Sequence, residues 1–240
     1  MKKLLALIAL AACGGDDGGG GGIDAPNVDT PVVPAMITVS GTATAQSLQG
    51  AMPVEGLTVA AFKATDEATA VVMTTTDAAG MYTLMIPTGG MPVDGFIKGT
   101  KAGFADTYLY APEPLIADFA GGSLNMLTNG NNGNYDLLHT LCQAGAADPT
   151  KGLIAVIVQD GAAAPVAGAT VDANPAASKT CYSGDMFPDG SKTVTNADGL
   201  AIMFNTLGNE TVSATLTGST FKSHAVKAFP GSFTTTLIVQ

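Results

Sequence analysis

Two stretches of this sequence share one pattern: Pro53–Phe62 reads PVEGLTVAAF, and Pro165–Asn174 reads PVAGATVDAN. Both contain P-V-x-G-x-x-V, and their starts lie 112 residues apart. Similar segments at a fixed separation indicate an internal repeat. The fold therefore follows from a module that occurs twice.

A second pair of segments extends the repeat. Thr74–Ile86 reads TTTDAAGMYTLMI and Thr193–Phe204 reads TVTNADGLAIMF, so that Gly80 matches Gly199 at an offset of 119 residues. The second copy is therefore seven residues longer. The extra residues fall within PAASKTCYSGDMFPDGSK, Pro175–Lys192, which contains a cysteine.

Each copy alternates short runs rich in Val, Ile, Thr and Phe with turns of Asp, Asn, Gly and Pro. Turn signals every ~8–12 residues are typical of an antiparallel β-sandwich. We predict an all-β fold of two tandem antiparallel sandwiches, immunoglobulin-like or prealbumin-like, at residues 36–128 and 151–240. The linker, residues 129–150, spaces three leucines on one face of a short helix at about residues 135–144. Side chains expected to point inward in the first module are Val59, Phe62, Tyr82, Leu84, Ile86 and Ile97.

The N-terminus predicts export. Residues 1–12 place two lysines before a nine-residue apolar run, which is shorter than the ~20 residues that span a bilayer, as in a signal peptide. The run ends in Leu-Ala-Ala-Cys13, which resembles the lipobox of bacterial lipoproteins and implies lipidation of Cys13. The alternative is an ordinary signal peptide with a chance cysteine. Residues 13–35 are rich in Gly, Asp and Pro and predict a flexible tether. Gly14 stands where an aspartate favours the inner membrane, so we expect the outer membrane of the cell envelope.

Two cysteines, Cys142 and Cys181, remain once Cys13 carries lipid. In an oxidising compartment a pair predicts one disulfide, which here closes a 39-residue loop and contributes ~3–4 kcal/mol. The alternative is two buried free thiols. The spacing provides neither a C-x-x-C redox pair nor a zinc cluster.

The first module resembles the carboxypeptidase regulatory-like domain, a prealbumin-like sandwich. The resemblance lies in Pro53–Val59 together with Thr76-Asp77-Ala78-Ala79-Gly80-Met81-Tyr82, which gives T-D-x-x-G-x-Y. Asp77 is expected to cap a tight turn, Gly80 to take a positive φ and Tyr82 to return into the core. The second module departs from this motif, because Ala201 stands where the aromatic residue belongs. The resemblance implies a non-catalytic accessory module, and no cofactor.

Candidate chemistry is sparse. With no arginine, and eight lysines against twenty acidic residues after residue 12, the chain is a poor candidate for binding nucleic acid. His139 and His224 are interpreted as ordinary polar residues, and no G-x-S-x-G elbow exposes a serine. Asp185 and Asp189 lie in a loop that could hold a cation, although solvated acids are commoner, and no metal site is predicted.

Tyr108 and Tyr110 share one strand face, so they could form a platform for a sugar or a peptide, or simply be core residues. The sequence therefore predicts a non-enzymatic lipoprotein, attached to the membrane through its lipid, with two sandwiches for protein interaction or envelope structure. The alternatives are a carbohydrate- or peptide-binding module, with an envelope protein or a glycan as partner, and, least favoured, an accessory module of a hydrolase or a cryptic enzyme.

Overall fold

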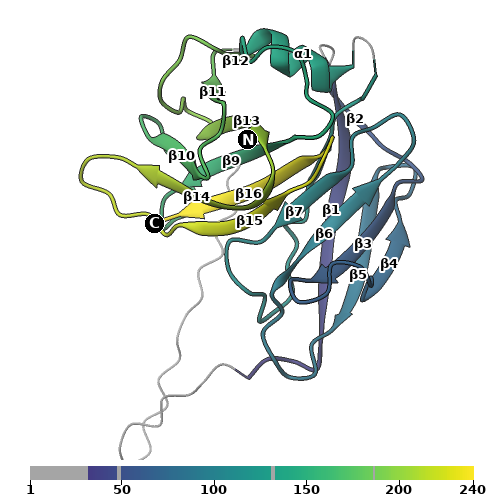
Figure 1. The fold of residues 1–240 in the computed structure, drawn as a ribbon. Coiled ribbons are helices and arrows are strands. Elements are labelled where there is room, and N and C mark those ends of the chain that lie inside the picture. Colours follow the sequence, from purple (N-terminus) through teal and green to yellow (C-terminus); the bar gives the residue numbers. More distant parts are fainter. Residues whose placement is uncertain (1–31, 48–49, 131–132, 186) are drawn as a thin grey trace, which may run out of the picture. The chain divides into compact units, whose positions relative to one another are not determined.

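The computed structural model describes residues 32–47, 50–130, 133–185 and 187–240 (Figure 1). Within them, Val32–Gln240 forms one compact unit. The signal peptide at residues 1–12, the lipidation site Cys13 and all but the end of the tether lie outside the described residues.

The regular secondary structure of the described residues is β-strands and one short helix, which confirms the predicted all-β fold of two sandwiches. The first repeat contains β1 (Met36–Ser47), β2 (Gly50–Pro53), β3 (Thr58–Lys63), β4 (Val72–Thr75), β5 (Met81–Pro87), β6 (Gly95–Thr100), β7 (Thr107–Tyr110) and β8 (Leu124–Met126). The helix α1 (Asn134–Leu141) follows. The second repeat contains β9 (Gly152–Gln159), β10 (Thr170–Asn174), β11 (Lys179–Ser183), β12 (Pro188–Asp189), β13 (Leu200–Thr206), β14 (Gly208–Thr215), β15 (His224–Ala228) and β16 (Phe233–Val239).

The two repeats share one strand connectivity. In the first layer of each sandwich, β1 pairs antiparallel with β5 and parallel with β8, and β9 pairs in the same way with β13 and β16. In the second layer, β3–β6–β7 corresponds to β10–β14–β15. The repeat seen in the sequence is therefore a repeat of the whole sandwich.

The turn motifs of the two repeats make the same contacts. Thr76 Oγ1 donates to the Val54 carbonyl at 2.5 Å and accepts the Leu57 N–H at 2.9 Å. Thr195 Oγ1 donates to the Val166 carbonyl at 2.7 Å and accepts the Ala169 N–H at 2.9 Å. Because this hydroxyl clamps the P-V-x-G loop in each copy, we call the pair the threonine locks.

The turns that follow the threonine locks need glycine, because of their backbone conformation and the lack of space for a Cβ atom. Gly80 has φ +73° and Gly199 has φ +68°. A Cβ at Gly80 would lie 2.5 Å from the Ala43 carbonyl oxygen, and one at Gly199 would lie 2.5 Å from the Val158 carbonyl oxygen. Asp77 accepts the N–H groups of two residues in its turn, at 2.9 and 2.8 Å, so its predicted capping role is confirmed.

The sandwiches join edge to edge. Strand β7 of the first repeat pairs in parallel with β16 of the second, with Thr107 opposite Phe233 and Leu109 opposite Thr235. The result is a nine-stranded sheet in the order β12-β11-β13-β9-β16-β7-β6-β3-β4 (Figure 1). The second layer of the first sandwich thus continues as the first layer of the second.

The inserted segment changes one strand pairing. In the first repeat β4 pairs with β3, whereas in the second repeat β11 pairs with β13 and lies in the opposite layer of its sandwich. Strand β11 carries Cys181, and β12 pairs with it. The longer loop of the second copy therefore widens the nine-stranded sheet by two strands.

Most side chains predicted to point inward are buried. Five of them have exposed fractions of 7% or less: Val59, Tyr82, Leu84, Ile86 and Ile97. Phe62 is half-buried and packs against the neighbouring core, because it lies on the other face of its sheet.

Candidate functional site

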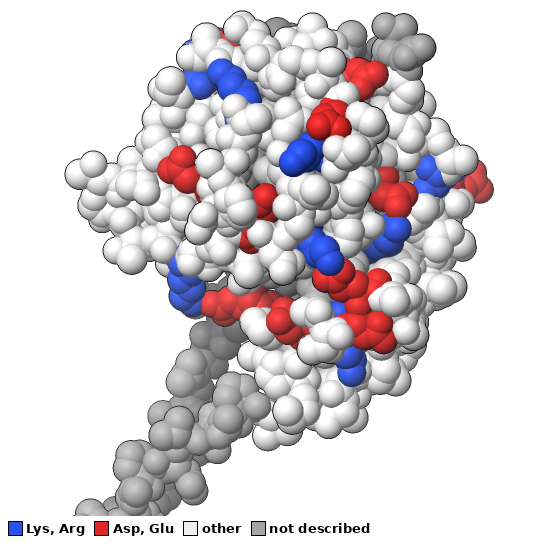
Figure 2. All heavy atoms as spheres, viewed as in Figure 1, with Lys and Arg blue, Asp and Glu red and all other residues white. Residues whose placement is uncertain are grey.

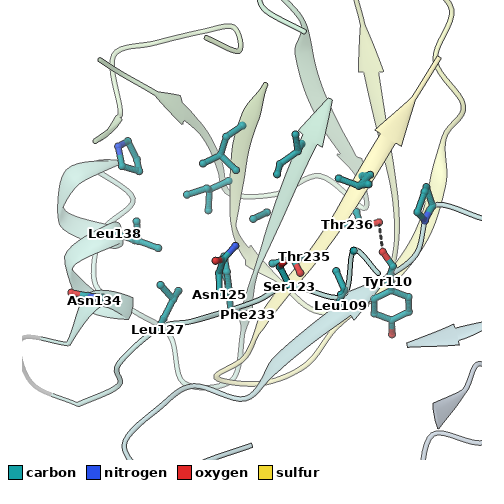
Figure 3. Close-up of a pocket in the computed structure, with 18 of the residues that line it drawn as sticks. Leu109, Tyr110, Ser123, Asn125, Leu127, Asn134, Leu138, Phe233, Thr235 and Thr236 are labelled. Carbon is teal, nitrogen blue, oxygen red and sulfur yellow. Dashed lines mark hydrogen bonds between the residues drawn. The ribbon is translucent and has the colours of Figure 1, made fainter. Parts of the chain in front are cut away.

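An apolar groove of about 550 Å³ lies on one face of the nine-stranded sheet (Figure 3). Its floor comes from β13, β9, β16 and β7. One wall is α1, and another is β8 with its flanking residues. The groove is therefore built where the covering layer of the first sandwich ends and the helix begins.

The alternation of the strands makes the floor apolar. Along β9, Val156 and Val158 face the core on one side of the sheet, and Ile157 between them faces the groove. Along β16, Ile238 faces that core and Leu237 lines the groove. Successive side chains of a strand point to opposite faces, so these mostly apolar strands present hydrophobic side chains on both.

The helix wall presents three leucines: Leu137, Leu138 and Leu141. The sequence predicts an apolar face at these positions, and the structure places that face half-buried against the groove. The side of α1 that packs into the protein instead carries Tyr135 and His139. The helix is thus fixed to the core by one side while its leucines stay available on another.

A disulfide fixes the helix at its C-terminal end. Cys142, the C-cap residue, is bonded to Cys181 on β11 with a Cα–Cα distance of 5.6 Å, which confirms the predicted pairing. Both cysteines are fully buried. The Gly190 N–H also donates to the Leu141 carbonyl at 3.3 Å. The wall of the groove is therefore tied to the inserted segment of the second repeat.

The polar lining side chains come from β8, from α1 and from the floor. Ser123 and Asn125 come from β8 and its flank, and Asn134 is the first residue of α1. Thr235 and Thr236 line the floor, but each hydroxyl donates to a backbone carbonyl of β7 at 3.2 Å. No Asp, Glu, Lys or Arg is among the residues described as lining the groove. Figure 2 shows charged side chains elsewhere, scattered over one face in small mixed groups.

Tyr108 and Tyr110, the predicted stacking platform, lie on the opposite face of the sheet from the groove. Their exposed fractions are 6% and 8%, because the second repeat covers them. The Tyr108 ring stacks on Phe229 with centroids 4.1 Å apart, and burial raises the pKa of Tyr110. Figure 3 shows the Tyr110 ring pointing away from the groove while its carbonyl accepts from Thr236. The predicted ligand platform is therefore wrong: both tyrosines are core residues, which is the alternative that the sequence left open.

The two histidines lie in different clusters. His139 is 3% exposed, with its ring edge-on to Phe204 at 4.8 Å, and neither ring nitrogen meets hydrogen-bond geometry with another described residue. Burial lowers the pKa of His139, although the nearby Gly145 backbone and Asp136 oppose this. His224 Nδ1 lies 2.7 Å from Thr236 Oγ1, and burial lowers the pKa of His224 as well.

The acidic loop of the second repeat satisfies its own backbone. Asp189 accepts from the N–H and the hydroxyl of Ser191 at 2.8 and 2.7 Å, and these bonds lower the pKa of Asp189. Among the described residues, no three or more His, Cys, Asp and Glu side chains gather in a group that could hold a metal ion. No helix within the described ranges is long and apolar enough to cross a membrane.

Sequence reasoning missed the groove, because its parts come from distant segments. Leu109, Ser123, Leu138, Ile157 and Leu237 meet only when β7 pairs with β16. The three helix leucines were the one local signal.

Neither the protein-family models nor the curated proteins gave a match. Among solved structures, the chain is similar to the shaft pilin SpaA of Lactobacillus rhamnosus GG, with 13% identity, coverage of 85% of this chain and 96% of that one, and a TM-score of 0.27. It is similar to GBS52, a minor pilin of Streptococcus agalactiae, with 11% identity, coverage of 85% and 94%, and a TM-score of 0.27. It is also similar to the Bacillus anthracis TIE protein, with 10% identity and a TM-score of 0.27, covering 85% of this chain and 34% of that one. Similarity this weak leaves the function to be argued from the groove.

Proposed function

We propose that this chain is a non-catalytic lipoprotein of the cell envelope that displays two joined sandwiches as a binding and structural module. In this proposal Cys13 carries the lipid, residues 13–35 form the tether, and the repeats are carboxypeptidase regulatory-like modules. The observation that carries the proposal is the groove of about 550 Å³, which lies on a sheet shared by both sandwiches. A concave, mostly apolar site with few polar groups is the usual form of a binding site.

The groove favours binding over catalysis. The side chains that line it are hydrophobic, hydroxyl or amide groups. General acid–base or nucleophilic catalysis needs a titratable group within hydrogen-bond reach of the reacting atom. Neither histidine is among the residues described as lining the groove: the buried His139 packs on Tyr135 and Phe204, and the half-buried His224 contacts Thr236 and Tyr110.

The anchor is tested by Cys13→Ser. We expect the variant to incorporate no labelled palmitate and to leave the membrane fraction, or to accumulate as uncleaved precursor, because the thiol that takes the lipid is absent. Cys142→Ser is the matched control, since its thiol lies in the folded body, and it should keep the label. Equal palmitate incorporation by wild type and Cys13→Ser would contradict the anchor.

The binding role is tested by a photo-crosslinking amino acid in place of Leu138, on the groove wall. The same amino acid in place of Met85 is the control, because Met85 is 58% exposed on β5, outside the groove. Irradiated envelopes should give an adduct from position 138 and none from position 85. Identical adducts from both positions, or none from either, would refute a binding role for the groove. A polypeptide adduct would identify a protein partner, including the peptide ligand considered from the sequence.

A further inference from the structure

We propose that the groove binds the acyl chain of an uncharged lipid, such as a glyceride. The inference rests on the proposed function, because it takes the groove as the binding site. It goes further by naming the chemical class of the ligand.

The dimensions favour a small, elongated ligand. The floor crosses four neighbouring strands, β13, β9, β16 and β7, and three spacings of ~4.8 Å give a width of ~14 Å. The volume of about 550 Å³ lies within the ~300–1,000 Å³ of small-molecule sites. A stable protein partner would instead cover about 800 Å² of surface on each side. Walls on two sides, α1 and β8, favour a ligand that enters the space over one that lies across a flat face.

The absence of charge from the described lining selects the head group. A carboxylate or phosphate held in this space would lose its hydration without gaining a cationic partner. The chain has no arginine, and none of its lysines is among the lining residues. An ester or hydroxyl head group avoids this cost, because neutral polar groups hydrogen-bond with hydroxyl and amide side chains.

The placement of the polar side chains orients the ligand. Ser123, Asn125 and Asn134 belong to the β8 wall and to the first turn of α1. Ile157 and Leu237 are apolar floor residues, from β9 and β16. An amphiphile matches the polarity of both surfaces if its head lies by β8 and α1 and its methylenes lie along the floor, where each methylene removed from water adds to the affinity.

The groove is preformed. Tyr135 and His139 hold the buried side of α1, and the Cys142–Cys181 bond fixes its C-terminal end. The leucine wall therefore cannot rotate its side chains into the core without breaking these contacts. A site that keeps its shape when empty loses less conformational entropy when the ligand enters.

The test uses the full chain carrying Cys13→Ser, so that no lipid of its own competes. N-Phenyl-1-naphthylamine, an uncharged fluorophore, reports occupancy, and it is displaced with a monoacylglycerol or with the fatty acid of the same chain length at pH 8. We expect the glyceride to displace the probe at concentrations at least tenfold lower than the carboxylate. Equal displacement by the two, or no probe binding, would overturn the proposal.

A charge exchange makes the test specific to the groove. Ile157→Lys puts a cation on the floor of the groove. It should weaken binding of the monoacylglycerol at least tenfold and strengthen binding of the fatty acid. Met85→Lys makes the same charge change on an exposed strand outside the groove and should alter neither. Leu138→Lys, on the half-buried helix wall, replaces Ile157→Lys if that variant has a lower melting temperature than Met85→Lys. Unchanged selectivity in the groove variant would overturn the proposal.

The crosslinker at position 138 distinguishes the proposed lipid from other possible occupants of the groove. An adduct with a free uncharged lipid supports the inference. A protein adduct, or one with the acyl chains on Cys13 of the same molecule, would overturn it and leave the binding role of the groove intact.

Discussion

The threonine locks offer the sharpest test of the repeat. Thr195→Val keeps the shape of the side chain and removes its hydroxyl, which donates to the Val166 carbonyl at 2.7 Å and accepts the Ala169 N–H at 2.9 Å. Thr195 is 3% exposed and Ala169 is fully buried, so water cannot replace both bonds without rearrangement. The variant leaves a buried donor and an acceptor without their partner.

The expected cost follows from those two groups. A buried polar group left unsatisfied costs about 1–3 kcal/mol, and here the total should be about 2–4 kcal/mol. For a body of about 200 residues, 1 kcal/mol lowers the melting temperature by about 2–4 °C, so we expect a loss of about 5–15 °C. Thr195→Ser is the matched control, because it keeps the hydroxyl and should cost less than about 1 kcal/mol.

The first repeat supplies an internal replicate. Thr76→Val should cost about as much as Thr195→Val, because Thr76 makes the same two bonds and is 4% exposed. Calorimetry and urea unfolding of both variants and their double mutant provide the comparison. Two outcomes would refute the reasoning: a valine variant within about 0.5 kcal/mol of wild type, or a serine control that loses as much as valine.

Three further predictions concern the cysteines, the histidines and the junction. Cys142→Ser/Cys181→Ser should lower the free energy of unfolding by about 3–4 kcal/mol through the 39-residue loop, and equal urea midpoints with and without the bond would contradict this. His139 has a lowered pKa, so stability should be full above its ordinary pKa of ~6.5 and fall as the pH drops below it. Between pH 7.5 and pH 5.5, urea unfolding should show a smaller drop in unfolding free energy for His139→Leu than for wild type, and His224 accounts for the drop that remains. A drop equal to that of wild type would exclude His139 as the cause. Residues 36–128 alone should give a β-type circular-dichroism spectrum yet self-associate in ultracentrifugation, since the edge of β7 and the Tyr108 ring lose their cover. A monomeric fragment as stable as the whole chain would show that the junction contributes little.

Local patterns predicted the parts of the fold that depend on neighbours in the chain. Gly80 and Gly199 mark turns that need a positive φ, and this requirement is visible in the sequence because each glycine follows a polar turn at a fixed offset. The alternation in β5 predicted that Tyr82, Leu84 and Ile86 would be buried. The cysteine pair was predictable because only one intramolecular pairing remained once Cys13 was assigned to lipid.

The junction and the groove depend on long-range pairing and could not be predicted in this way. The pattern of β7 is compatible with an exposed edge or a buried strand, and only β16, about 126 residues later, decides between them. The same pairing turned Tyr108 and Tyr110 from a possible platform into core. The change of partner between β4 and β11 was equally hidden, because a short strand carries no signal for the layer that it joins.

The parallel pairing of β7 with β16 sets an order on folding. Strand β16 is the last strand of the described chain, and its Thr236 hydroxyl reaches the Tyr110 carbonyl across 126 residues. Contacts of such long sequence separation form late, because the loop between them must close first. The face of the first repeat that carries Tyr108 and Tyr110 therefore stays uncovered until the C-terminal strand has been made and has paired with β7. In that interval the unfinished protein exposes the most apolar surface, so it is then most prone to aggregate and offers a chaperone the most surface to bind.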